Sequence, residues 1–466
     1  MKSFLLNTLD DIRTSYWFIP AIMAVGAIVL SFCAIQFDAS LDGQGPDWMS
    51  WLFDNQPEGA REVLSTLAGS MVTVAGVVFS ITLVTVSNAA FQFGPRLLTT
   101  FMRDRANQVT LGTFIATFLY CLMVLRAVQS VPASASDESA SSFVPHVALL
   151  GALALAICSI AVLIYFIHHV PRSIHVSRIV AQIGEELCQR LDDRFPIALG
   201  EAAHERPDDK ACETFRKTVL TASKSQPVVT SQTGYIRVID ADSLIETAKE
   251  QKLQIVLLRH PGDFVAKGDE LMRVLGSHDE VGEDVLDDLS DTISVGAMRT
   301  QLQDIEFLSQ ELAEIAMRAL SPGINDPVTA ITAMNWLGAG IGLLGQREPL
   351  SPLRMDDEGK PRVFSPTVGL PELLRASLGS IVPFAARNVV AGRSYIRVLD
   401  EIRGRLDERF VPYLEKQRQE FFEIAEAELS RQELDSLKTL ARITEESKEG
   451  GEAGWRKRLR QTVLRK

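Results

Sequence analysis

Four long stretches without a charged residue constrain the fold of this 466-residue chain more than any other feature of its sequence. They cover residues 14–37, 63–95, 106–125 and 139–171. A helix needs about 20 apolar residues to cross the hydrocarbon core of a bilayer, and each stretch is that long. The sequence therefore predicts four transmembrane helices. They are expected near residues 16–36, 64–88, 108–128 and 145–168.

The distribution of basic residues predicts the orientation of these helices. Lys2 and Arg13 precede the first span, and the loop before the third span carries three arginines. The loop after the first span has only Arg61 among several acidic residues, and residues 131–144 contain no lysine or arginine. Because cytoplasmic loops are enriched in Lys and Arg, both termini of this multi-pass protein are expected in the cytoplasm.

The second predicted span carries a stripe of small and hydroxyl-bearing residues. The hydroxyl-bearing residues recur every seven residues, close to two helical turns, and two glycines flank them on nearly the same face. The stripe consists of Thr66, Gly69, Thr73, Gly76, Ser80 and Ser87. One interpretation is close packing between membrane helices. The other is a wetted pathway lined by this stripe in a homo-oligomer. A proton-relay pump is disfavoured, because the span centres contain no acidic residue, lysine or arginine.

The rest of the chain is typical of a cytosolic α+β part. We predict five regions: a four-span transmembrane domain at 1–171, a helical linker at 172–224, a small β-rich module at 225–277, a helical bundle at 278–450 and a basic tail at 451–466. Within the module, "PGDFVAKGDELMRV" resembles the hairpin of barrel-sandwich domains, which implies a barrel-like fold. No lysine here has the flanking residues typical of the lysine that those domains modify. The Pro-, Gly- and charge-rich residues 346–362 are expected to form a solvated loop.

A rigid polar elbow, "SPGINDP", joins two predicted helices of the cytosolic part. Pro322 ends the first helix, and Asp326 is suited to cap a second, largely apolar helix that begins at Pro327. Capping alone explains Asp326. The alternative is a ligand or ion pocket built from the elbow and from charges on or near the preceding helix. Its candidate residues are Arg299, Asp304, Arg318, Ser321, Gly323, Asn325 and Asp326.

Several of these segments together resemble one known family. "RALSPGINDPVTA", "QFGPRLL", "QVTLGTFIATFLYCLMVLR" and "GYIRVID…PGDFVAKGDEL" occur in the order typical of a bacterial family of predicted membrane proteins, domain of unknown function 2254. The resemblance covers roughly residues 10–440. It implies an inner-membrane protein with an N-terminal membrane part and a cytosolic C-terminal part, and it implies no activity.

Other features exclude common functions. There is no phosphate-binding glycine loop, HExxH or GxSxG motif, so we do not expect an enzyme. The five cysteines lack metal-ligand spacing and Pro171 interrupts the histidines of 168–175, so neither a metal nor a cofactor is expected. A net charge of −12 disfavours nucleic acid. The basic residues 455–466 predict either contact with anionic lipid or a solvated helix end.

Two functional hypotheses follow. In the first, the protein is a homo-oligomeric channel or passive transporter in the lipid bilayer, with a cytosolic regulatory part. In the second, it is a membrane-anchored sensor or scaffold that binds a ligand or partner through its cytosolic part.

Overall fold

The computed structural model describes residues 16–40, 57–94, 104–129, 143–173, 175–194, 209–277, 280–346, 351–366 and 368–449. Its contacts divide the chain between His175 and Val176 into two compact units. We call the part before this boundary the span unit and the part after it the soluble unit. The predicted tail at 451–466 lies outside the described residues.

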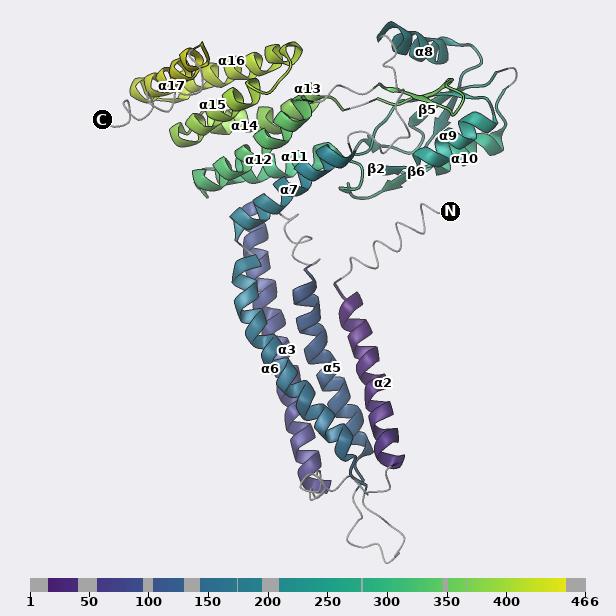
Figure 1. The fold of residues 1–466 in the computed structure, drawn as a ribbon, viewed down its shortest axis with the longest axis vertical. Coiled ribbons are helices and arrows are strands. Elements are labelled where there is room, and N and C mark those ends of the chain that lie inside the picture. Colours follow the sequence, from purple (N-terminus) through teal and green to yellow (C-terminus); the bar gives the residue numbers. More distant parts are fainter. Residues whose placement is uncertain are drawn as a thin grey trace, which may run out of the picture. The chain divides into compact units, whose positions relative to one another are not determined.

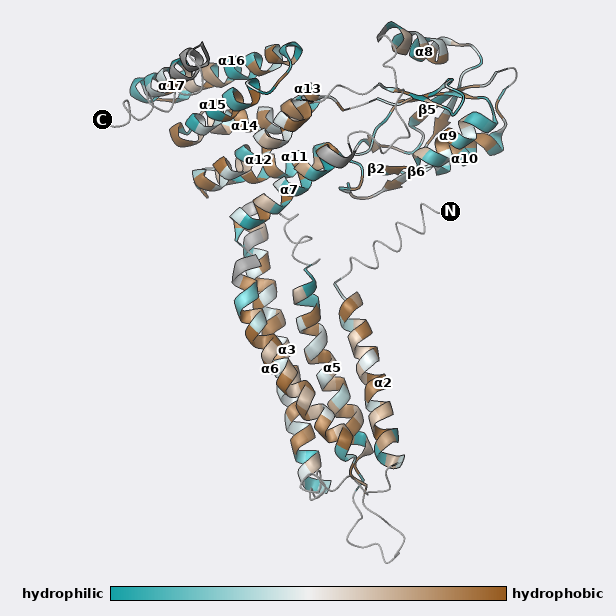
Figure 2. Ribbon diagram, viewed as in Figure 1, coloured by the Kyte–Doolittle hydropathy of each residue, from teal (hydrophilic) through white to brown (hydrophobic). Residues whose placement is uncertain are grey.

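The span unit consists of four long helices (Figure 1). They are α2 (Phe18–Ser40), α3 (Pro57–Phe93), α5 (Arg105–Ala127) and α6 (His146–Ser173). Helices α5 and α6 each pack against all three others, and the contacts of α5 are the more extensive. Each helix coincides with a predicted span, and brown, hydrophobic residues cover most of their length in Figure 2. Over the described residues a fifth helix, α12 (Pro327–Gly345), is also long and apolar enough to cross a membrane.

Polar contacts at one end of the span unit join helices that are far apart in sequence. The Asp38 carboxylate at the end of α2 accepts hydrogen bonds from the backbone N–H groups of Val147 and Ala148, both at 2.9 Å. It thereby caps α6, whose first N–H groups have no partner within the helix. Arg61 donates to the carbonyl of Val128 at 2.8 Å, which joins α3 to the end of α5.

The strands of the soluble unit form two sheets, and the described residues contain no closed barrel. A five-stranded sheet has the order β1 (Gln226–Val229), β5 (Glu270–Leu275), β3 (Gln254–Leu257), β8 (Pro361–Phe364) and β7 (Leu353–Met355). A three-stranded sheet has the order β4 (Phe264–Val265), β2 (Gly234–Ile239) and β6 (Ile293–Gly296). The barrel-like module predicted at 225–277 is therefore a pair of sheets that also recruits strands from 293–296 and 353–364.

The hairpin β7–β8 differs most from the prediction of a solvated loop at 346–362. Strand β8 pairs with β3 in parallel, with Ile255 opposite Val363. The carboxylate of Asp356 holds the turn, because it accepts hydrogen bonds from the backbone N–H of Lys360 and from Arg362. Helices α8 (Asp209–Thr221), α9 (Ala241–Glu250) and α10 (Glu283–Asp291) pack on the sheets. Buried aliphatic side chains such as Ile236, Leu244 and Met272 form the core between them.

The remaining helices form a bundle with α12 (Figure 1). They are α7 (Val176–Arg194), α11 (Ile305–Ala319), α13 (Leu370–Leu374), α14 (Ser380–Ala385), α15 (Val389–Arg403), α16 (Val411–Glu428) and α17 (Arg431–Glu449). Helix α12 is buried and packs against α7, α11, α13 and α15, whereas α16 and α17 pack against α15. Its glycines allow this close packing: a Cβ at Gly338 would lie 2.7 Å from Val398, and one at Gly340 would lie 3.1 Å from Leu187.

Candidate functional site

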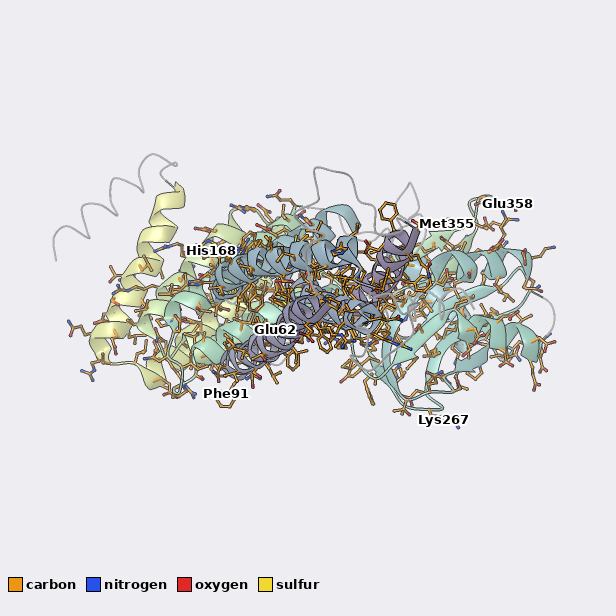
Figure 3. All side chains as sticks on the ribbon, turned by 90° about the horizontal axis from the view of Figure 1, so that it is seen from below. Glu62, Phe91, His168, Lys267, Met355 and Glu358 are labelled. Carbon is orange, nitrogen blue, oxygen red and sulfur yellow. The ribbon has the colours of Figure 1, made fainter. Side chains whose placement is uncertain are left out.

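The predicted stripe on α3 points away from the other helices of its own chain. All six of its residues are exposed, on the side opposite the buried residues Leu64, Met71 and Val78. The Thr73 hydroxyl bonds the carbonyl of Gly69 at 2.9 Å, so the helix backbone satisfies it. Phe91, near the end of the helix, also projects outward and is 86% exposed (Figure 3).

The two glycines of the stripe have open space beside them. A Cβ placed at Gly69 or Gly76 would meet no other atom within 4 Å. The other glycines of the span unit are of both kinds: Gly26 and Gly59 are also open, whereas a Cβ at Gly112 would lie 2.5 Å from the sulfur of Met23 and one at Gly151 would collide with Tyr120. The stripe is thus a face on which small residues have no packing reason within the chain. Its role in lining a pathway stays a prediction.

A second polar face, which the sequence analysis did not single out, lies inside the span unit. Helix α5 buries Asn107, Thr110 and Thr117 at intervals of three and seven residues. The hydroxyls of Thr117 and Ser159 lie 2.9 Å apart and join α5 to α6. The spacing was readable in the sequence, but one helix face can be either outward or inward, and only the packing distinguishes the two.

Thr82 of α3 belongs to this interior. It is 6% exposed, and its hydroxyl has no hydrogen-bond partner among the described residues. Helices α3 and α5 are antiparallel, and Arg61 of α3 bonds Val128 of α5. Thr82 is 21 residues from Arg61, and Asn107 is 21 residues from Val128. At the rise of an α-helix, Thr82 and Asn107 therefore each lie about 32 Å from the contact between Arg61 and Val128. Thr82 is therefore level with Asn107.

At this end of the span unit a histidine and an aspartate form an ion-pair geometry. Nε2 of His169 lies 2.8 Å from Oδ2 of Asp104. Asp104 is also the N-cap of α5, because its Oδ1 accepts the N–H of Ala106 at 2.9 Å. Of the three histidines in "HHVPRSIH", His169 is the one with a described carboxylate partner.

The structure separates the seven elbow candidates into two groups at opposite ends of α11. Arg299 and Asp304 lie at its first turn, and the other five lie at or beyond its last turn. A 15-residue helix is about 22 Å long, so the two groups do not line one pocket. At the elbow, Asp326 is the N-cap of α12 and accepts the Thr329 N–H at 3.2 Å. Asn325 adopts a positive φ of 51°.

The first group forms a junction between the sheets and the helical bundle. Nε of Arg299 donates to Oδ2 of Asp304 at 2.7 Å, and its NH1 donates to Gln310 at 2.6 Å. Gly262, with φ +96°, lies against this pair, and a Cβ there would collide with the Asp304 carboxylate. Burial raises the pKa of the Asp304 carboxyl, and Arg299 and the N–H of Phe307 offset only part of that effect.

Neighbouring residues strengthen the same junction. The Gln303 side chain accepts from the N–H of Ile239 at 2.8 Å and donates to its carbonyl at 3.0 Å. Arg190 of α7 donates to the carbonyls of Gln301 and Leu302. Residues 299–304, which we call the connector, are therefore bonded to the three-stranded sheet on one side and to α7 on the other.

The soluble unit also has an open groove of about 390 Å³ between α8 and the five-stranded sheet. It is lined by Lys210, Ala211, Thr214, Phe215, Thr218 and Gln254. No group of three or more His, Cys, Asp or Glu residues in the described ranges has a geometry suited to a metal ion.

Long apolar helices joined to a large α+β part define a membrane protein with a substantial soluble unit. The chain belongs to the family described as "Predicted membrane protein (DUF2254)", whose model matches residues 13–401. Two relatives are named "Uncharacterized protein", Rv1290c of Mycobacterium tuberculosis and Mb1321c of Mycobacterium bovis. Each is 29% identical over 401 residues, which is 84% of this chain and 73% of the relative. No solved structure matches the chain.

Proposed function

We propose that this protein is a non-enzymatic, homo-oligomeric channel or passive transporter of the inner membrane. Helices α2, α3, α5 and α6 are its four spans, both termini are cytoplasmic, and α3 is the helix through which copies meet. The observation that carries the proposal is the stripe on α3: its residues are small or hydroxyl-bearing, all are exposed, and its two glycines have open space beside them.

The physical argument starts from the cost of placing this face against lipid. Lipid tails offer hydroxyl groups no hydrogen-bond partner, and glycines leave shallow grooves that lipid tails fill poorly. In membranes, faces of Gly, Ser and Thr are typical of close contact between helices. A second copy of α3 supplies such a contact. Around a symmetry axis the same residues present rings of hydroxyl oxygens, which can replace part of the hydration shell of an ion.

Reconstitution of the purified protein in liposomes tests the proposal. We expect flux of ions or small solutes, and we expect Thr73→Leu combined with Ser80→Leu to abolish it, because two apolar rings would dewet the pathway. Val72→Leu, on the same helix and 48% exposed, is the matched control and should conduct normally. Absence of flux at every pH, voltage and divalent-cation concentration tested would rule the channel out.

The second candidate is a membrane-anchored sensor or scaffold. The connector favours it, because it bonds the sheets to α7, the helix that follows the last span helix in the chain. The groove beside α8 offers a place for a small ligand. The same liposome experiment separates the two candidates. An intact oligomer that gives no flux would favour the sensor or scaffold. Flux that the α3 substitutions block would exclude a purely anchoring role for the spans.

A further inference from the structure

The contact between Asp104 and His169 has the features of a pH-sensitive contact between two helices. The two side chains are similarly accessible, at 25% and 24% exposed, so water can deliver a proton to either. The contact is short, at 2.8 Å, and joins the first turn of α5 to the last turns of α6. It is therefore a tie between two helices rather than a contact within one.

The surroundings hold the imidazole in place. The ring of Tyr165 stacks on it with centroids 5.3 Å apart and an interplanar angle of 17°. The Tyr165 hydroxyl lies 3.4 Å from Nδ1, on the side of the ring away from Asp104. A ring fixed at both nitrogens keeps Nε2 directed at the carboxylate in either protonation state.

Few other charges face this pair from the packed helices. The described residues 63–94 of α3 carry no charged side chain. At this end, Tyr16 precedes α2, and Arg105 follows Asp104 on α5. On α6 and just after it lie His168 and His175. Asp104 is thus the acidic group within reach of the imidazole among the described residues, and it decides how the contact responds to protonation.

We propose that Asp104 and His169 form a proton-operated latch that fixes the end of α6 to the start of α5. Imidazole is the side chain whose charge ordinarily changes between about pH 5 and pH 8. The protonated ring makes a charge-assisted hydrogen bond to the carboxylate, roughly twice as strong as a neutral one. Loss of the proton weakens the tie. Only residues 174 and 175 separate α6 from α7, so the latch acts where the span unit continues into the soluble unit.

A distance measurement by electron spin resonance tests the latch without any assay of transport. Nitroxide labels replace Val109 on α5 and Ile164 on α6, which are 40% and 66% exposed and each five residues from the pair. The full chain, with its five native cysteines replaced, is studied in lipid nanodiscs at about pH 5 and about pH 8. We expect a narrow distance distribution at the lower pH and a broader one at the higher pH.

Two variants decide the assignment. Asp104→Asn removes the charge but keeps an N-cap, since Asn caps helices as well as Asp does. It should be equally broad at both pH values, as should His169→Gln. His168→Gln is the matched control and should keep the pH response. A distribution in the parent protein that does not change with pH, or a response that survives in His169→Gln, would overturn the latch. Neither result bears on whether the protein conducts.

Discussion

Helices α3 and α12 look alike in sequence, and the structure uses them in opposite ways. Both are long, apolar and interrupted by glycines, and both meet the criteria for a membrane span. In α12, neighbouring side chains occupy the space beside three glycines: Val398 beside Gly338, Leu187 beside Gly340 and Leu406 beside Gly345. In α3, Gly69 and Gly76 face open space. Packing within the chain explains the glycines of α12, whereas it does not explain those of α3, and the proposed contact between copies rests on that difference.

The largest expected effect is on assembly. Gly69→Leu combined with Gly76→Leu should convert the proposed oligomer to monomers, because two bulky side chains would hold a second α3 beyond packing distance. The particle mass in detergent, by native mass spectrometry, measures this change. The thermal midpoint of the monomeric chain should not fall, since a Cβ at either position meets no neighbouring atom of its own chain within 4 Å. An oligomer of unchanged mass would mean that this face contacts lipid and would break the comparison.

The next effect is on the stability of the soluble unit. Gly338→Leu should destabilise it by about 1–3 kcal/mol, the usual cost of overpacking a core. The Cβ alone would lie 2.7 Å from Val398. Thermal unfolding monitored by the fluorescence of Trp336, whose ring packs against Gly184 of α7, reports it. Gly323→Ala, at an open position of the same unit, is the control and should leave the midpoint nearly unchanged.

The smallest effect compares a hydroxyl inside the span unit with one on the stripe. Thr117→Val removes the bond to Ser159 and should cost about 1 kcal/mol. Thr73→Val removes only a bond to its own helix and should cost much less in a monomer. Unfolding of the span unit, measured on the monomeric full chain in mixed micelles, gives the change in unfolding free energy for both variants. Equal costs would show that the two polar faces are not distinguished by their surroundings.

The sequence carried more information about membrane insertion than about the sheets. Long uncharged stretches are a strong local signal, and α2, α3, α5 and α6 lie where they predict helices. Strands β7 and β8 were missed because each is only three or four residues long and because β8 pairs with β3, about a hundred residues away. The Pro- and Gly-rich residues around them are typical of loops, and only the distant partner makes them a sheet.

The candidate sites show the same division between local and distant information. Asp326 as a cap followed from its neighbours, since a capping carboxylate needs only a backbone N–H group two or three residues later, at the start of a helix. Arg299 and Asp304 were grouped with the elbow in the sequence, but the structure places them at the opposite end of α11. The Asp104–His169 pair was invisible in sequence, because its members are 65 residues apart and meet only when α5 and α6 pack.

Asp38 gives the order of assembly of the span unit a physical basis. This residue lies in the last turn of α2, and its carboxylate accepts hydrogen bonds from two N–H groups in the first turn of α6. During synthesis α6 emerges after α2, α3 and α5, and its leading amides find their acceptor only on a helix that has been in the membrane throughout. A chain that lacked Asp38 would leave the N–H groups of Val147 and Ala148 without this acceptor, so packing of the four helices in the intact chain depends on a single acidic side chain.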